Sequence, residues 1–200
     1  MSRKISLIVL ALFLMATPAL AGPLAGHANA IPGFTGSTPF AFGTLTGYVD
    51  YAVFLPGDYP GYANYTPTPG ELAYTYQVYV TGTAPVTVFT VDIDPSSPVD
   101  NIGYFFDGDG TQIPFDYFFV SGGAEWDFDG IVQGDASVGL AFSSPNLPVD
   151  YTGNVVDTGQ SAFVIPLPSP GPVPIPEPST LVLGSVAVGL GLLLARRRRS

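Results

Sequence analysis

Three acidic side chains stand at alternate positions around the single tryptophan of the chain: Glu125, Asp127 and Asp129 beside Trp126. Two carboxyl groups are enough for a glycosidase, and an aromatic ring is the kind of surface on which a sugar stacks. The same spacing also fits a short strand whose acids face solvent while Trp126 and Phe128 face the core. We expect the second arrangement, because a chain of this length has little room for a substrate cleft.

Two short runs of aspartate and glycine have the composition of a site for a hard cation. Residues 107–110 read Asp-Gly-Asp-Gly and residues 127–130 read Asp-Phe-Asp-Gly. Calcium takes carboxylate and carbonyl oxygens in such turns, although Asp-Gly is equally an ordinary hairpin turn. Neither run has EF-hand spacing, because Ala136 stands where a loop beginning at Glu125 needs a bidentate glutamate. Ca²⁺ is therefore the one cofactor that the sequence suggests, with the candidate ligands Asp107, Asp109, Asp127 and Asp129.

Most other catalytic side chains are missing from the middle of the chain. Cysteine is absent, and every lysine and arginine lies near one of the two ends, at Arg3, Lys4 and residues 196–199. The single histidine, His27, lies close to the N-terminus. Ser-His-Asp hydrolysis and histidine-ligated zinc are therefore excluded, and we expect a protein without enzymatic activity.

The acidic residues occupy the part of the chain from which the basic ones are absent. All 16 acids lie between Asp50 and Glu177, and 15 of them precede the proline-rich stretch that contains Glu177. Without lysine or arginine nearby, each carboxylate must sit in water, accept hydrogen bonds or bind an external cation. This distribution argues against nucleic acid and anionic surfaces as partners. It also predicts that salt or divalent cations stabilise the fold.

The elements that position these side chains are expected to be strands, because the dominant hydrophobic period is two. Between Leu72 and Val80 the apolar side chains occupy even positions, while Ala73, Thr75 and Gln77 occupy odd ones, as in a half-buried strand. Glycine- and proline-rich turns separate similar stretches at residues 45–55, 86–93, 102–106, 115–120, 136–142 and 161–165. Residues 40–165 are therefore predicted to form an all-β domain, an antiparallel β-sandwich with a jelly-roll or immunoglobulin-like arrangement.

Two stretches of biased composition flank this domain. Residues 22–39 are rich in glycine, proline, serine and threonine, which predicts a flexible lead-in. Residues 166–178 carry a proline at every second position, which predicts a linker in the polyproline II conformation. At about 3.1 Å per residue this linker would hold the domain up to roughly 40 Å from whatever follows it.

A charge-free apolar run of 17 residues, 179–195, follows the linker. Its length is at the low end of what a transmembrane helix needs to cross a hydrocarbon core of roughly 30 Å. The arginines of the tail, residues 196–200, are expected to stay in the cytoplasm by the positive-inside rule. The membrane is therefore a predicted partner, and the domain before Pro176 is expected to lie outside.

The end of the chain combines a Pro-Glu-Pro tripeptide, the apolar run and an arginine cluster, carried by Pro176, Glu177, Pro178, Ser179, Thr180, Arg196, Arg197, Arg198 and Arg199. In this order they resemble the PEP-CTERM sorting signal of Gram-negative envelope proteins. The resemblance implies recognition by an exosortase, a membrane-embedded enzyme that cuts near the tripeptide, and it is associated with bacteria that make extracellular polysaccharide and biofilm. It covers only residues 175–200, so it implies nothing about the activity of the rest.

The first residues have the pattern of a secretory signal peptide. Arg3 and Lys4 precede an apolar segment over residues 5–15, and a short segment then ends in Ala19-Leu20-Ala21. Small residues at Ala19 and Ala21 predict cleavage after Ala21, so that residues 1–21 are the signal peptide. A second small-x-small site at residues 28–30 is an alternative that requires an unusually long segment before the cut.

These features predict an exported protein of a Gram-negative cell envelope or extracellular matrix, membrane-anchored before processing, with a non-catalytic structural or surface role. The alternative is a carbohydrate-binding module for extracellular polysaccharide, because the 11 tyrosines and one tryptophan suit stacking on sugars. A small carboxylate-based glycosidase is a third reading. Exposed rings in a groove would favour glycan binding, buried rings a passive surface component, and two carboxyl groups about 5 to 10 Å apart in a cleft the glycosidase.

Overall fold

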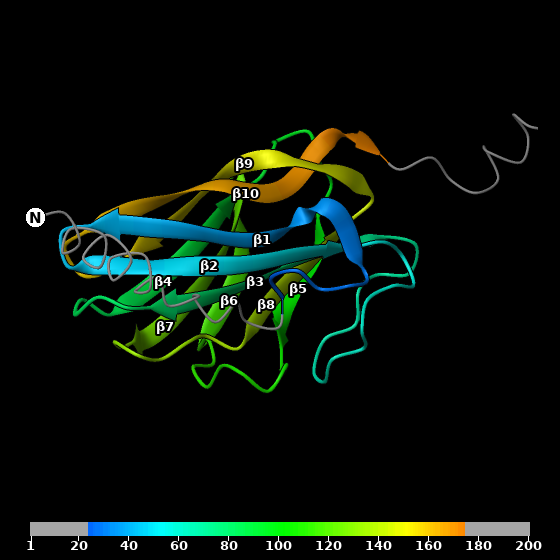
Figure 1. The fold of residues 1–200 in the computed structure, drawn as a ribbon. Coiled ribbons are helices and arrows are strands. Elements are labelled where there is room, and N and C mark those ends of the chain that lie inside the picture. The colour runs from blue at the N-terminus through cyan, green and yellow to red at the C-terminus, as the bar shows by residue number, and fades with distance from the viewer. Residues whose placement is uncertain (1–23, 175–200) are drawn as a thin grey trace, which may run out of the picture.

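Ten strands within residues 24–174 form two antiparallel five-stranded sheets that pack face to face as a β-sandwich (Figure 1). This computed structural model describes residues 24–174. The first sheet has the order β1-β2-β3-β8-β5 and the second has the order β10-β9-β4-β7-β6, which confirms the predicted antiparallel sandwich. The strands are β1 (Ala30–Phe42), β2 (Leu45–Phe54), β3 (Leu72–Val80), β4 (Val86–Asp92), β5 (Asp100–Phe105), β6 (Asp116–Val120), β7 (Gly123–Ile131), β8 (Gly139–Ser144), β9 (Asn146–Val156) and β10 (Ser161–Pro174).

Large aromatic side chains fill the space between the two sheets. Trp126 of β7 stacks on Phe89 of β4 with ring centroids 5.8 Å apart, and Tyr76 of β3 lies 6.3 Å from the same indole. The indole N–H of Trp126 donates to the Gly103 carbonyl at 2.9 Å, so its burial leaves no donor without a partner. Burying a large apolar side chain stabilises a fold by about 1.5–3 kcal/mol, so this aromatic layer is a main source of cohesion between the sheets.

The odd-numbered side of β3 is buried as well, which differs from the half-buried strand expected from the sequence. Ala73, Thr75 and Gln77 are all at most 1% exposed. A second hydrophobic cluster covers this outer face of the first sheet, and residues 55–71 contribute Tyr65 to it. The alternation of apolar residues along β3 cannot predict this burial, because most of the cluster comes from other segments of the chain. The buried members of the cluster are Leu24, Ala30, Ala52, Phe54, Tyr65, Ala73, Phe105 and Ala141.

The N-terminal segment belongs to the folded body. β1 begins at Ala30 and pairs with β2, and Leu24 is fully buried in the cluster on the outer face. The Thr35 hydroxyl donates to the Leu24 carbonyl at 2.8 Å and accepts from the Gly26 N–H at 2.8 Å. Residues 24–39 are therefore not the flexible lead-in expected over residues 22–39, because strand pairing and burial hold them.

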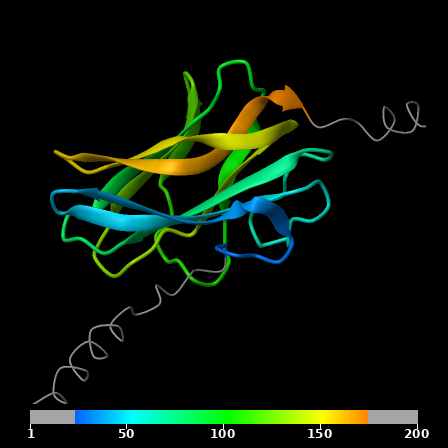
Figure 2. The same ribbon diagram turned by 45° about the horizontal axis from the view of Figure 1, so that its top comes forward.

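β10 carries most of the expected linker into the second sheet. Residues 166–174 continue the strand beside β9 (Figure 2), whereas a polyproline II spacer was expected over residues 166–178. Proline has no N–H to donate to a sheet ladder but keeps its carbonyl group, so the carbonyl groups of a proline-rich edge strand still need donors. The structure supplies these partners from other elements of the sandwich.

Four side chains hold the main-chain carbonyl groups of this stretch, and we call them the proline clasp. They come from β1, β3, the β4–β5 connection and β9, far from β10 in sequence except for β9. The clasp therefore joins the last strand to both sheets. Its hydrogen bonds run from Thr38 Oγ1 to Pro166 O (2.7 Å), from Tyr76 Oη to Pro168 O (2.5 Å), from Ser97 Oγ to Gly171 O (2.7 Å) and from Asn146 Nδ2 to Gly171 O (2.5 Å).

The two addressing segments lie outside the described residues. These are the signal peptide over residues 1–21 and, at the other end, the Pro-Glu-Pro tripeptide, the apolar run 179–195 and the arginine tail 196–200. Within residues 24–174, no helix has the length and apolar character to cross a membrane. The transmembrane helix and the sorting signal stay predictions.

Candidate functional site

The three carboxylates around Trp126 project from the outer face of the second sheet. Glu125 and Asp127 are half-buried and Asp129 is exposed, whereas Trp126 and Phe128 are 0% and 3% exposed. This is the expected strand arrangement, with the rings in the core. Because the Trp126 ring is sealed between the sheets, it offers no surface on which a sugar could stack beside these acids.

The acids of this face perturb one another. Burial, and then the charge of Asp116 on the neighbouring β6, raise the pKa of Asp127. Burial, followed by the charge of Asp127, raises the pKa of Glu125 in the same way. Asp127 lies directly opposite Asp116 in the β6–β7 register, so like charges meet across the pair without a lysine or arginine in residues 24–174 to offset them.

The other calcium candidates, Asp107 and Asp109, lie in the connection between β5 and β6 and contact β3. Asp107 Oδ1 accepts from the Asp109 N–H at 3.1 Å and from Gln77 Nε2 at 3.4 Å. Asp109 Oδ2 accepts from the Tyr79 hydroxyl at 3.0 Å. Burial raises the pKa of Asp107, against the opposing effect of the main-chain N–H groups around it. The loop therefore uses its own carboxylates to fasten itself to the first sheet.

The two predicted calcium runs do not come together. Asp107 and Asp109 contact side chains of the first sheet, while Asp127 and Asp129 are on β7 of the second sheet. Among residues 24–174, no three histidine, cysteine, aspartate or glutamate side chains are grouped as metal ligands. Each run therefore stands alone, and calcium binding at either of them stays a prediction.

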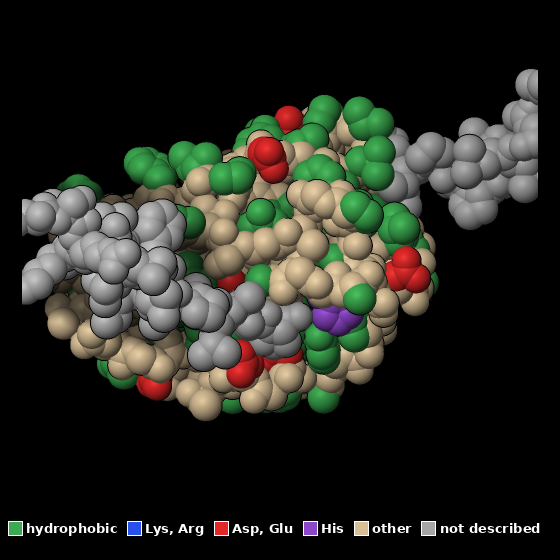
Figure 3. Space-filling model, viewed as in Figure 1, with side chains coloured by type: hydrophobic (Ala, Val, Ile, Leu, Met, Phe, Trp, Pro, Cys, Tyr) green, Lys and Arg blue, Asp and Glu red, His purple; other side chains and the backbone are tan. Residues whose placement is uncertain are grey.

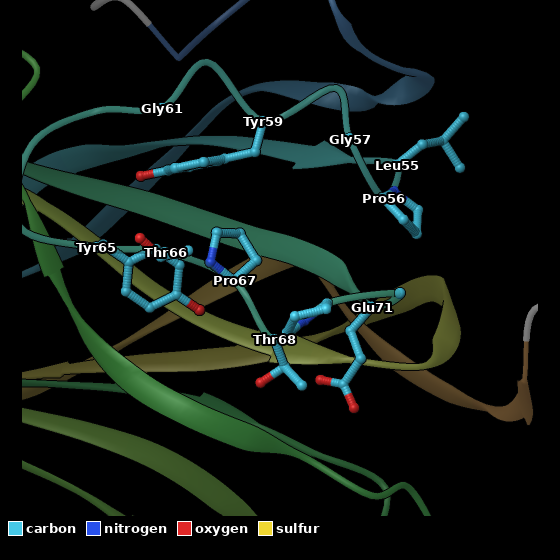
Figure 4. A pocket seen from close by; sticks show the side chains of 12 residues that line it. Leu55, Pro56, Gly57, Tyr59, Gly61, Tyr65, Thr66, Pro67, Thr68 and Glu71 are labelled. Atoms are coloured by element: carbon cyan, nitrogen blue, oxygen red, sulfur yellow. The ribbon is translucent and has the colours of Figure 1, made fainter.

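A hollow of about 260 Å³ opens where residues 55–61 and 65–71 meet, and we call it the Tyr59 hollow (Figure 4). Tyr59, Tyr65 and prolines provide much of its wall, and Glu71 provides its carboxyl group. In Figure 4 the Tyr59 ring lies on one side, while Tyr65 and Glu71 flank Thr68 on the other. This hollow combines aromatic rings, prolines and a carboxyl group in its wall, the mixed lining that small-ligand sites have.

An aromatic cluster fixes the loop that forms this hollow. The Tyr59 ring meets Phe54, Tyr65 and Phe105 edge to face at centroid distances of 5.8 to 6.0 Å. Tyr62 stacks on Phe105 at 5.0 Å with the ring planes 9° apart. Such contacts each stabilise by about 0.5–1.5 kcal/mol beyond burial, so Tyr59, Tyr62 and Tyr65 anchor this segment to β2 and β5 although it forms no strand.

Three oxygens of residues that line the hollow are buried without a hydrogen-bond partner: Tyr59 Oη, Tyr65 Oη and Glu71 Oε2. Burial raises the pKa of both tyrosines far above its usual range, so both hydroxyl groups stay protonated. The nearby Ser143 hydroxyl opposes the shift at Tyr65, but it does not form a hydrogen bond of ordinary geometry with that group. A buried polar group without a partner costs about 1–3 kcal/mol.

A second, smaller hollow of about 170 Å³ lies between residues 93–99 and 120–123. Its carboxyl group, Asp94, is already engaged, because Oδ1 accepts from the Ser96 N–H at 2.8 Å and from the Ser96 hydroxyl. These bonds lower the pKa of Asp94. Each of the two hollows thus has one carboxyl group in its wall, and neither has the carboxylate pair that glycoside hydrolysis requires.

The Tyr59 hollow was not anticipated from the sequence. Its signal is the spacing of Tyr59, Tyr62 and Tyr65, three residues apart within a stretch rich in glycine and proline. The composition of this stretch predicts a turn, but the tyrosines pack on Phe54 and Phe105, which lie on strands β2 and β5.

Comparison of the chain with models of protein families, with curated proteins and with solved structures finds no match.

Proposed function

We propose that this chain is an exported, non-catalytic structural or surface component of a Gram-negative envelope or extracellular matrix, delivered through a PEP-CTERM tail. The observation that carries the proposal is the position of the folded body. Leu24, the first residue that the structure describes, is buried and follows the predicted cleavage after Ala21, and β10 reaches Pro174, the last described residue, just before Pro176. The sandwich therefore fills the interval between the two addressing segments.

The charge of the body agrees with this assignment. Residues 24–174 contain 15 acids and His27 but no lysine or arginine, and the face in Figure 3 has acidic side chains at separate places and none coloured as basic. Such a body repels nucleic acid and other polyanions, and all the basic residues remain in the segments that engage the export and sorting machinery. An exosortase and the membrane are the partners of the tail.

The ectodomain is proposed to lack enzymatic activity, because it has no lysine, arginine or cysteine, and because neither of the two hollows described above within residues 24–174 has a pair of carboxyl groups in its wall. A carbohydrate-binding role is the second candidate, and the Tyr59 hollow is the observation that favours it. The alternation of the chain between the two sheets is compatible with a jelly-roll or an immunoglobulin-like arrangement, and that finer assignment stays part of the proposal.

Mass spectrometry of the mature protein, read at both ends, tests the export and sorting proposal. We expect an N-terminus at Gly22 and a C-terminus that lacks Arg196 to Arg199. Cleavage at the second site, after Ala30, would remove the buried Leu24 and is not expected. Surface-exposed protein that keeps its intact arginine tail would contradict sorting by cleavage.

A further inference from the structure

We propose that the Tyr59 hollow binds one neutral, hydroxyl-rich sugar unit. The inference rests on the carbohydrate-binding candidate and gives it a location, but it does not depend on export or on the sorting tail. Three observations carry it: the volume of the hollow, its wall of rings and prolines, and the unpartnered oxygens of Tyr59, Tyr65 and Glu71.

The unpartnered oxygens define which ligand would suit them. The Glu71 carboxylate oxygen can accept but not donate, whereas the hydroxyls of Tyr59 and Tyr65 can do both. A ligand hydroxyl can donate to Glu71 and accept from a tyrosine at the same time. An ammonium group can donate only, so it would leave the tyrosine protons without an acceptor. An anion would be repelled by Glu71 and by the 14 other acids of the body.

The size and surface of the hollow fit a single sugar ring. Its volume of about 260 Å³ is just below the range of about 300–1,000 Å³ that is typical of drug-sized ligands. The C–H face of a pyranose can pack on the Tyr59 ring and on Pro67, which both line the hollow. With so few atoms in contact, we expect a dissociation constant in the millimolar range.

Access to the sealed oxygens requires a small movement of the segment beside Thr68. The Thr68 N–H makes a long hydrogen bond of 3.4 Å to Ser143 Oγ, and Glu71 is half-buried at the edge of the hollow. Rotation of the Glu71 side chain and a shift of Pro67–Thr68 would bring the carboxylate and the Tyr65 hydroxyl to the ligand. Figure 4 shows both side chains next to this segment.

The test is a titration of the full-length chain in detergent, followed by NMR of the backbone amides of residues 55–71. The probes are glucose, galactose, mannose and N-acetylglucosamine, each up to about ten times the expected millimolar dissociation constant. We expect saturable shifts with at least one sugar. Glu71→Gln and Tyr65→Phe should each weaken that binding about tenfold or more, because glutamine replaces the charged acceptor by a neutral amide and phenylalanine removes the tyrosine hydroxyl. Glu125→Gln, on the other sheet, is the matched control and should bind as the parent does. A thermal melt of each variant establishes that it is folded.

Three results would overturn the proposal in distinguishable ways. Sugar binding that Glu71→Gln and Tyr65→Phe leave unchanged would place the carbohydrate site elsewhere while keeping the carbohydrate-binding candidate. The absence of any saturable shift with the four sugars would reject both for those sugars. Saturable binding of tetramethylammonium or calcium chloride in place of the sugars, lost in Glu71→Gln, would show that the hollow takes cations.

Discussion

The hydroxyl groups of two buried tyrosines are expected to have opposite effects on stability. Tyr76 is 0% exposed, and its hydroxyl donates to the Pro168 carbonyl in the proline clasp. Tyr65 is 7% exposed, and its hydroxyl has no hydrogen-bond partner. Replacing each by phenylalanine removes one oxygen and keeps the ring, so the pair compares a satisfied buried hydroxyl with an unsatisfied one.

Tyr76→Phe should lower the free energy of unfolding by about 1–3 kcal/mol, because the Pro168 carbonyl loses its donor at a fully buried position. For a domain of this size each kcal/mol corresponds to a shift of about 2–4 °C in melting temperature. Tyr65→Phe should leave the melting temperature unchanged or raise it, because the substitution removes a polar group that is buried without compensation.

Urea denaturation followed by tryptophan fluorescence measures both variants, because Trp126 lies in the core and reports the loss of the sandwich. A fall in midpoint with an unchanged slope would assign the effect to stability rather than to the unfolded state. Equal destabilisation by the two substitutions, or a larger loss for Tyr65→Phe, would refute the reasoning that the clasp holds β10 through its tyrosine hydroxyl.

Three further predictions concern the charge of the body and the role of its last strand. Burial raises the folded-state pKa of Asp107, Glu125 and Asp127, so the folded protein binds protons there more tightly than the unfolded chain does. The unfolded carboxyl groups titrate at about pH 4, and the contribution of these three groups to stability is lost as pH rises from there through their raised folded-state pKa values. The melting temperature should therefore be higher at about pH 4 than at about pH 7, and the reverse order would contradict this sign. Added sodium chloride should raise the melting temperature at neutral pH, because it screens the repulsion among the 15 acids. If calorimetry finds that salt lowers the melting temperature, repulsion among these acids does not destabilise the fold. A chain that ends at Ile165 should not unfold cooperatively, whereas one that ends at Pro174 should keep the parent's urea midpoint; similar midpoints for the two would mean that residues 166–174 contribute little.

The sandwich and the orientation of its tryptophan followed from local pattern. Period-two alternation and glycine- and proline-rich turns can be recognised in the sequence itself. The alternation places Trp126 and Phe128 on one face of β7, whichever strands lie next to β7. The same pattern underestimated the burial of β3, because the residues that cover Gln77 and Ala73 come from other parts of the chain. Alternation reports one strand, whereas burial depends on every segment that packs on it.

The role of the proline stretch could not be predicted from its composition. Seven prolines at alternate positions have no ladder donors, and locally this is the signature of an extended spacer. Residues 166–174 pair with β9, and their carbonyl groups accept from Thr38, Tyr76, Ser97 and Asn146, whose approach depends on the completed sandwich. The Tyr59 hollow escaped prediction for the same reason, because its tyrosines pack on strands that lie elsewhere in the sequence.

The incorporation of residues 166–174 into β10 also limits the free spacer in the proposed membrane-attached precursor. Nine of the 13 residues expected as a linker belong to the sandwich, so at most four remain before the predicted transmembrane run, a span of roughly 15 Å instead of the 40 Å that a free linker would give. The body would therefore lie close to the headgroups, and wherever those are anionic its 15 acids would be repelled by them. Cleavage of the tail would then remove this repulsion as well as free the protein.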